Sequence, residues 1–189
     1  MDVKLQKMTF SGVYPKLDEF YGILAANRAR LKPWFWWADE KFTPNKFRFA
    51  LFILVYLFDT KHKQITHVLC NKIDYDEQFL IFVDNKFGGM IGLDNISSLN
   101  KNAEIWYWVE KEFESKGIAS QSLKIIEDYS LKEKGINSLY AKIAFDNTRS
   151  ANMAKRNNFD VIKIDYNIRT SARNPKIADI MTWTKQLVR

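Results

Sequence analysis

Cysteine is almost absent from this chain of 189 residues, which contains only Cys70. A lone thiol cannot form an intramolecular disulfide, so the sequence fits a reducing compartment. The two histidines, His62 and His67, have no convincing carboxylate or cysteine partner at the spacing that metal sites use. We therefore expect neither a metal site nor a cysteine nucleophile.

Long hydrophobic runs and linker-like stretches are also missing. The densest apolar run, FALFILVYLF (49–58), is too short to cross a bilayer as a helix. The stretch MDVKLQKMTF (1–10) lacks the apolar segment of a signal peptide. With 4 prolines, 7 glycines and no internal repeat, nothing divides the chain. We expect a single domain over 1–189, in a cytoplasmic protein with no membrane partner.

What the chain does contain is a substantial core and a positive charge. Hydrophobic residues make up 47% and aromatic residues 15%, which argues against disorder. Lys and Arg number 29 against 22 Asp and Glu, a net charge of +7 that suits a phosphate-bearing cofactor or another acidic partner. The basic residues are scattered and no RNA-binding aromatic motif is present, so nucleic acid is the weaker inference.

Hydrophobic periodicity predicts an α/β (α+β) architecture. Helical spacing predicts helices at 15–31, 118–134 and 146–159, and length favours another at 47–58, where the period does not separate helix from strand. Strands are predicted, mostly by alternation, at 3–10, 79–85, 87–93, 103–110, 137–145, 160–168 and 177–187. The order of these elements predicts a mixed, mostly antiparallel sheet of about seven strands flanked by about four helices.

Local signals refine this arrangement. Asp84-Asn85 should form a hairpin turn, and Gly88-Gly89 a turn or bulge. Gly135 and Asn158 stand where left-handed residues end helices. Within 103–110, alternation assigns residues to two faces. One face takes Ile105, Tyr107 and Val109, and the other takes Glu104, Trp106 and Trp108.

The stretch FESKGIAS (113–120) lies between a predicted strand and a predicted helix. The first amides of a helix lack partners within it, and its dipole leaves positive charge there. The small residues Ser115, Gly117 and Ala119 would let phosphate oxygens approach those amides, and Lys116 adds a cation. An ordinary strand–helix turn explains one glycine equally well, and both common nucleotide-loop patterns are absent. The loop alone leaves both interpretations open.

The segments around this loop resemble the GNAT superfamily of N-acetyltransferases. The stretch DNTRSANMAKRNNF (146–159) follows the loop, a helix and a strand in the order that family uses. Three further stretches are similar to the RimJ/RimL-type branch, which acetylates N-termini of ribosomal proteins. They are NRARLKPWFWW (27–37), the run from Gly88 to Ser120, and ADIMTW (178–183).

This resemblance implies an acetyl-CoA site. The family's Q/R-x-x-G-x-G/A signature falls on Glu114, Gly117 and Ala119, with Glu114 in place of the usual Gln or Arg. That departure places a carboxylate beside the phosphates. The resemblance implies further coenzyme contacts with backbone near the end of the 103–110 strand, with the loop amides and with the pantetheine arm. These contacts are Trp108, Val109, Ser115, Lys116, Gly117, Ile118, Ala119, Ser120 and Asn147.

Two residues are candidates for the chemistry. Glu104 could accept the amine proton through a water, or could be a solvent-facing structural carboxylate. Many family members use a tyrosine as the acid for the thiolate, but Ala154 occupies that position. Resemblance to the ribosomal-protein branch makes Ser150 the proton donor or thiolate partner, one helical turn earlier. The alternatives are a packing role for Ser150 and an N-cap role for Asn147, and the latter is compatible with coenzyme binding.

The acceptor is less defined. Trp34, Tyr107 and Asp179 are the candidates for its site, although core or dimer contact for Trp34 and a structural turn for Asp179 explain those two equally well. The resemblance implies an acetyl-CoA-dependent N-acetyltransferase acting on a primary amine, with the N-terminus of a protein, ribosomal proteins included, as the favoured partner. The rivals are a small amine such as a polyamine or antibiotic, and a non-catalytic acyl-CoA-binding protein. Aromatic residues allow for a homodimer.

Overall fold

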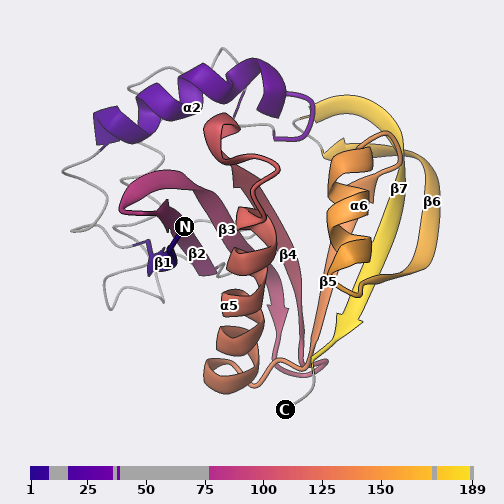
Figure 1. Cartoon of the computed structure of the whole chain (residues 1–189). Coiled ribbons are helices and arrows are strands. Elements are labelled where there is room, and N and C mark those ends of the chain that lie inside the picture. The colour runs from indigo at the N-terminus through magenta and orange to yellow at the C-terminus, as the bar shows by residue number, and fades with distance from the viewer. Residues whose placement is uncertain (9–16, 36–37, 39–76, 172–173, 188–189) are drawn as a thin grey trace, which may run out of the picture.

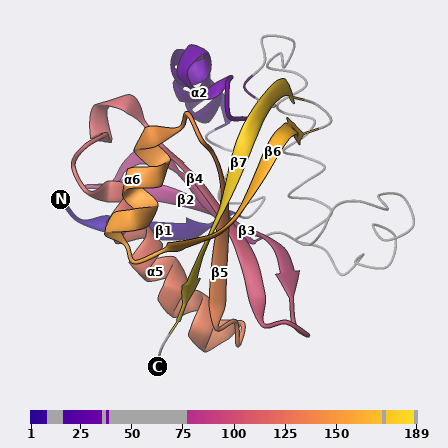
Figure 2. The same ribbon diagram turned by 90° about the vertical axis from the view of Figure 1, so that its right-hand side faces the viewer.

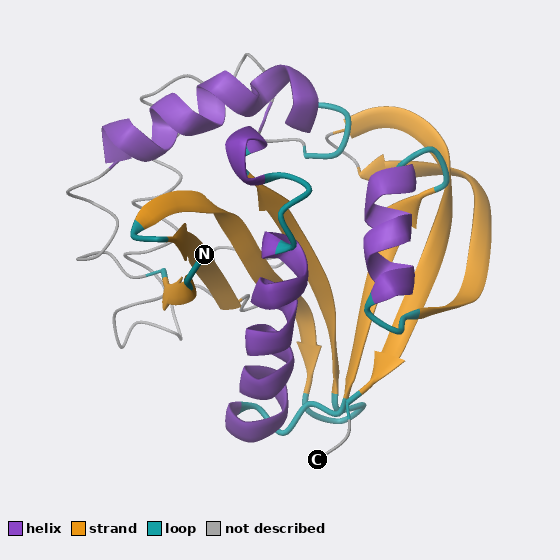
Figure 3. Cartoon of the chain, in the orientation of Figure 1, coloured by secondary structure: helices purple, strands orange, loops and turns teal. Residues whose placement is uncertain are grey.

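The computed structural model describes residues 1–8, 17–35, 38, 77–171 and 174–187. The helix predicted at 47–58, both histidines and Cys70 lie outside these described residues. Figure 1 shows the arrangement of the elements, and Figure 3 shows the same view coloured by secondary structure.

A seven-stranded sheet runs through the described part of the chain in the order β1-β2-β3-β4-β5-β7-β6. All neighbouring pairs are antiparallel except β4 and β5, which are parallel. The strands are β1 (Val3–Lys7), β2 (Glu77–Val83), β3 (Lys86–Ser97), β4 (Asn102–Val109), β5 (Ser138–Ala144), β6 (Asp160–Ser171) and β7 (Asn174–Gln186). The helices are α2 (Leu17–Leu31), the 3-10 turn η3 (Lys111–Phe113), α5 (Ile118–Glu133) and α6 (Thr148–Arg156). The predicted mixed, mostly antiparallel sheet is confirmed.

The sheet separates two apolar clusters. On one face, α5 and α6 pack against residues such as Ile81, Ile91 and Leu139. On the other, α2 contributes Phe20 and Leu31 to a cluster with aromatic and aliphatic sheet residues. These sheet residues are Leu80, Phe87 and Trp108, with Phe82, Met90 and Trp106 packed alongside. Figure 2 shows α5 and α6 together on one side of the sheet and α2 across its end.

Local turn signals in the sequence have the predicted effect. Asp84 and Asn85 have positive φ angles of 48° and 66° in the β2–β3 turn. The register of β2 against β3 shifts between Ile81 and Phe82, next to the Gly88-Gly89 pair. Gly89 has φ 138°, and a Cβ there would lie 2.2 Å from the Trp108 carbonyl oxygen, so only glycine allows this close approach of β3 to β4.

The parallel pair β4–β5 is short. Only Asn102, Ala103 and Glu104 pair with β5, whereas β4 continues to Val109. Beyond Glu104 the two strands diverge, and Figure 1 shows α5 in front of β4 and α6 in front of β5 on either side of the opening. Within the described residues, five residues of β4 therefore have a backbone edge with no partner strand on the β5 side, over about 16 Å at ~3.3 Å per residue.

The β6–β7 hairpin differs from the prediction. The polar, proline-containing stretch RTSARNPK (169–176) was expected to separate two shorter strands, but pairing continues through Arg169↔Ile177 to Ser171↔Asn174. Ladder hydrogen bonds between neighbouring strands outweigh the local turn preference of these residues. Among the helices of the described residues, none has both the length and the apolar character needed to cross a bilayer.

Candidate functional site

The loop between β4 and α5 presents amides at the open end of β4. Ser115 and Gly117 both have left-handed backbones, with φ 61° and 77°. In the described part of the chain, no amide of residues 115–120 donates to a backbone carbonyl, and the first to do so is Gln121, to the Gly117 oxygen at 3.0 Å. Backbone turns of this kind, combined with the positive end of a helix dipole, form concave sites for anions.

The loop has a fixed position because its neighbours are buried. Phe113 before it and Ile118 after it belong to the core on the α5 face, while Ser115, Lys116 and Gly117 between them are exposed. A Cβ at Gly117 would meet only the Gln121 amide nitrogen, at 3.8 Å. Glycine is therefore favoured at this position by its left-handed φ and not by crowding.

The first turn of α5 also contacts α6. Ala119 packs against the core cluster, and the Ser120 hydroxyl accepts a hydrogen bond from the side chain of Asn157 at 2.9 Å. Asn157 itself also donates to the Met153 carbonyl at 2.8 Å. A hydrogen bond thus joins the first turn of α5 to the C-terminal end of α6, the two helices that border the opening.

Glu114 precedes this loop, and its carboxylate lies between two arginines. One carboxylate oxygen is 2.5 Å from the Arg30 guanidinium, and the other is 2.7 Å from that of Arg149. Arg30 comes from α2 and Arg149 from the first turn of α6, so three separate elements meet at this carboxylate. Two cations therefore counter the negative charge that the sequence places beside the loop.

Arg30 also binds the end of β4. Its second terminal nitrogen donates to the Val109 carbonyl and to the Asn27 side chain, both at 2.7 Å. Asn27 is 3% exposed and also accepts from the Lys111 amide at 3.3 Å. Its amide nitrogen lies 3.3 Å from the Glu110 carboxylate. This network holds α2 against the strand end and the 3-10 turn.

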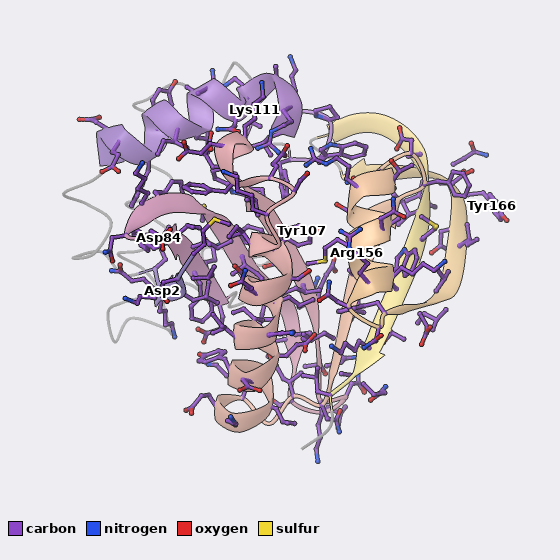
Figure 4. All side chains as sticks on the ribbon, in the orientation of Figure 1. Asp2, Asp84, Tyr107, Lys111, Arg156 and Tyr166 are labelled. Atoms are coloured by element: carbon purple, nitrogen blue, oxygen red, sulfur yellow. The ribbon has the colours of Figure 1, made fainter. Side chains whose placement is uncertain are left out.

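Tyr107 and Ser150 meet across the opening between β4 and β5. Tyr107 packs against the core on the α5–α6 side, and Figure 4 places it between these helices. Burial raises the pKa of the Tyr107 phenol. A hydrogen bond with the Ser150 side chain opposes that rise, as do the charges of Arg156 and Arg149.

Ser150 owes its position to the start of α6. Asn147 is the N-cap, and its side-chain oxygen accepts from the Ser150 amide at 3.2 Å. The cap leaves the Ser150 hydroxyl uninvolved in capping and half-buried near Tyr107. Ala154, one turn later, is buried in the core cluster.

Glu104 lies at the closed end of β4, on the opposite face from Tyr107. Its carboxylate accepts from Asn95 at 3.0 Å and forms an ion pair with Lys142 at 2.9 Å. Burial, followed by the charge of Glu104 and its hydrogen bond, raises the pKa of Tyr140 to about 12. Asp94 is the direct cross-strand partner of Glu104, and its carboxylate accepts from the Trp106 indole at 2.6 Å.

The remaining predicted residues lie in different surroundings. Trp34 is half-buried immediately after α2, and its neighbour Phe35 packs edge-on against Trp106 at 6.4 Å. Trp108 is buried in the cluster on the α2 face. The Asp179 carboxylate accepts from the Asn167 amide at 3.0 Å, where β6 is irregular.

The structure thus brings together the loop of 115–120, the end of β4, and the first turn of α6 with Asn147 and Ser150. It places Glu104 and Trp34 in separate surroundings, whereas the Asp179 carbonyl accepts from the Phe145 amide at 2.8 Å, two residues before Asn147. Arg30 and Arg149 were not among the predicted site residues. Arg149 could have been found from the sequence, because a cation in the first turn of a helix is unfavourable beside the positive end of the dipole. Its presence there predicts a nearby anion. Over the described ranges, no three His, Cys, Asp or Glu side chains form a group that could hold a metal.

Comparison with known proteins is consistent with this geometry. A family model described as "Acetyltransferase (GNAT) domain" matches residues 23–160. The ribosomal-protein-serine acetyltransferase of Escherichia coli is 31% identical over 101 residues, which is 53% of this chain and 56% of that protein. The chain spans about half the length of the curated relatives that it matches.

Solved structures show the same fold over nearly the whole chain. RimL, a ribosomal L7/L12 α-N-protein acetyltransferase in complex with coenzyme A, superposes with a TM-score of 0.78 at 22% identity, covering 98% of this chain and 94% of that one. The microcin C7 self-immunity acetyltransferase in complex with acetyl-CoA and AMP gives 0.76 at 18% identity, covering 98% and 92%.

Proposed function

The chain belongs to the GNAT acetyltransferase family, and from this premise we propose that it transfers the acetyl group of acetyl-CoA to a primary amine. The observation that carries this proposal is the loop of 115–120 at the open end of β4. Its left-handed Ser115 and Gly117 leave a row of amides without backbone acceptors in the described residues, which is the donor set that a diphosphate requires.

The residues around the loop fit the coenzyme. Glu114 would repel a diphosphate, and its ion pairs with Arg30 and Arg149 offset part of this repulsion. Among the described residues, the edge of β4 from 105 to 109 pairs with no strand on the β5 side, and Arg30 occupies only its Val109 carbonyl. The rest of this edge can pair with the amides of an extended pantetheine arm, as an added strand would. The coenzyme supplies an activated acetyl thioester, and the chain binds and orients it along this edge.

Ser150 and Tyr107 lie where that arm would end between the diverging strands. A leaving thiolate needs a proton or a hydrogen-bond donor. The Ser150 hydroxyl is the group that we assign to this role, and the Tyr107 phenol lies beside it. Backbone amides near Trp108 and Val109 are assigned to the thioester oxygen, where negative charge develops.

Glu104 is the proposed base on the other face of β4. An ammonium group has no lone pair, and a protein α-amine has a pKa near ~8, so much of it must lose a proton at neutral pH. Glu104 can accept that proton through a water, with Lys142 and Asn95 orienting its carboxylate.

For the acceptor we propose the N-terminal α-amine of a protein, with ribosomal proteins first. The stretch 27–37 carries the branch motif, and its Asn27 and Leu31 have structural roles in the network and in the core. The relative and the solved neighbour named above both act on ribosomal proteins according to their names. This function would place the protein in the cytoplasm.

An acceptor scan with labelled acetyl-CoA tests the proposal. One panel holds peptides with the N-terminal sequences of ribosomal proteins, and the other holds polyamines and aminoglycosides. We expect transfer to peptides, which disappears when the same peptides carry a blocked N-terminus. A peptide with an internal lysine and a blocked N-terminus separates α-amine from side-chain acetylation.

Each other outcome has a definite meaning. If small amines were acetylated and peptides were not, a small amine would replace the proposed acceptor. The proposed reaction, acetyl transfer to an amine, would still hold. Coenzyme binding without turnover of either panel would point to a non-catalytic coenzyme-binding protein. Absence of acetyl-CoA binding in calorimetry, with the protein folded, would overturn the enzymatic assignment.

A further inference from the structure

Two charged residues face each other across the mouth of the opening between β4 and β5. Glu114 stands at the end of the β4 side, immediately before the amide loop, and Arg149 stands in the first turn of the helix that follows β5. Their side chains are 2.7 Å apart. A ligand that lies along the β4 edge with its phosphates on the loop must pass this ion pair.

We propose that Arg149 is a binding residue for the coenzyme diphosphate, and that Glu114 is a resident carboxylate that holds Arg149 until the diphosphate replaces it. This proposal rests on the proposed coenzyme function. It assigns a role to the departure at position 114 that the family resemblance leaves unexplained.

The two arginines on Glu114 differ in how they are held. Arg30 has 30% of its side chain exposed and also donates to the Val109 carbonyl and to Asn27. The side chain of Arg149 is 60% exposed. Among the described residues, its guanidinium donates a hydrogen bond to Glu114 alone. Arg30 is therefore a fixed partner of Glu114, whereas Arg149 can turn toward a new anion.

Charge balance favours such an exchange. Glu114 keeps Arg30 when Arg149 leaves, so its half-buried carboxylate, with 17% of the side chain exposed, is not left uncompensated. Arg149 gains an anion of higher charge, and the planar guanidinium binds phosphate oxygens with two parallel donors. The exchange replaces one ion pair by another.

The carboxylate also has a cost for the ligand. A negative charge next to the loop repels a diphosphate over a distance shorter than the Debye length of about 8 Å at physiological ionic strength. Glu114→Gln should therefore tighten binding, both by removing this repulsion and by releasing Arg149. A residue that only supported the fold would have the opposite effect when replaced.

The test is calorimetry of coenzyme A with wild type, Glu114→Gln, Arg149→Gln and the double variant. We expect coenzyme A to bind about three- to tenfold more tightly to Glu114→Gln and about tenfold more weakly to Arg149→Gln. In the Arg149→Gln background, Glu114→Gln should tighten binding clearly less than in wild type, because no arginine remains to be released.

Asp128→Asn and Lys132→Gln are matched controls, since they make the same charge changes in an exposed ion pair of 3.1 Å in the second half of α5. Both should bind coenzyme A like wild type. Unchanged or weaker binding by Glu114→Gln, or unchanged binding by Arg149→Gln, would overturn the proposal. If Glu114→Gln tightened coenzyme A binding equally in wild type and in the Arg149→Gln background, Glu114 would act by charge repulsion alone. That result would overturn the proposed exchange.

A second ligand locates the phosphate. Dephospho-coenzyme A retains the diphosphate and lacks the ribose phosphate, so the Arg149→Gln effect should persist with it. If Arg149→Gln bound dephospho-coenzyme A as tightly as wild type does, Arg149 would contact the ribose phosphate. That result would overturn the assignment to the diphosphate. If wild type binds neither ligand, the proposed function fails as well, and normal wild-type binding with unchanged variants rejects this inference alone.

Discussion

The two ends of β4 each carry a glutamate beside basic residues, and the surroundings of the two carboxylates differ. Glu104 lies at the closed end, where β4 still pairs with β5, and has one cation, Lys142, whose side chain is 52% exposed. Glu114 lies beyond the open end and has two arginines from two helices. The closed-end carboxylate has uncharged neighbours in Asn95 and Tyr140, whereas the open-end one is enclosed by positive charge.

This difference separates two uses of a carboxylate. A general base must reach the proton directly or through a water, and the hydrogen bonds from Lys142 and Asn95 both go to one oxygen of Glu104. Both carboxylate oxygens of Glu114 are engaged, one by Arg30 and the other by Arg149, so this carboxylate is suited to positioning and anion exchange and not to contact with a substrate amine. We therefore expect chemistry at Glu104 and coenzyme handling at Glu114.

The largest effect should come from the open end, through Gly117→Glu. The variant forces a side chain into a left-handed backbone and adds a carboxylate where phosphate would lie. We expect the dissociation constant of coenzyme A to rise on the order of 10³-fold, measured by calorimetry. Gly135→Glu is the matched control, because Gly135 has φ 65° at the far end of α5. If Gly117→Glu and Gly135→Glu lost coenzyme A affinity equally, the loop would not be part of the coenzyme site.

The next effect should come from Ser150→Ala. Without the hydroxyl, the leaving thiolate loses its donor, so kcat should fall about 10²-fold, while the dissociation constant of coenzyme A should stay within about twofold. Steady-state kinetics and calorimetry measure the two quantities. Thr148→Ala controls for the loss of a hydroxyl in the same helical turn. A fall in coenzyme affinity that matches the fall in kcat would make Ser150 a binding residue.

The elements of this fold were predictable because their signals are local. Alternation assigned Tyr107 and Trp108 to the correct faces of β4, and the turn residues Asp84 and Asn85 have the expected left-handed backbones. Gly135 and Asn158 likewise have φ 65° and 63° at the ends of their helices. Each of these features depends on a few neighbouring residues, which the sequence displays directly.

The pairings within the site depend on residues far apart in the chain. Glu114 is 84 residues from Arg30 and 35 from Arg149, and only the packing of α2 and α6 brings them together. The sequence therefore predicted a Glu114 carboxylate beside the phosphates but not the two arginines that pair with it. The tie between Tyr107 and Ser150 was missed for the same reason, because it depends on how far β4 and β5 diverge.

At the closed end, Glu104→Gln should reduce the rate about 10- to 100-fold at pH 7, and the loss should shrink toward pH 9. The reason is that an α-amine with a pKa near ~8 becomes neutral without help at higher pH. Rates measured from pH 6.5 to 9.5 show the trend. Asp94→Asn controls for removing a negative charge from the cross-strand partner. A loss that is constant with pH would exclude Glu104 as the base.

The smallest effect should come from Tyr140→Phe, which removes a neutral neighbour of Glu104. The folded state raises the pKa of this phenol to about 12 and so favours its protonated form. Its contribution to stability is complete below the unfolded pKa near ~10 and is lost as pH rises through 12. Between pH 9 and 11, the free energy of unfolding in urea should therefore fall by about 0.5 kcal/mol more in wild type than in the variant, after allowance for solvent screening. Tyr166→Phe, an exposed phenol on β6, should follow wild type. Parallel slopes for wild type and Tyr140→Phe would show that burial and the charge of Glu104 do not raise the pKa of Tyr140 in the folded protein.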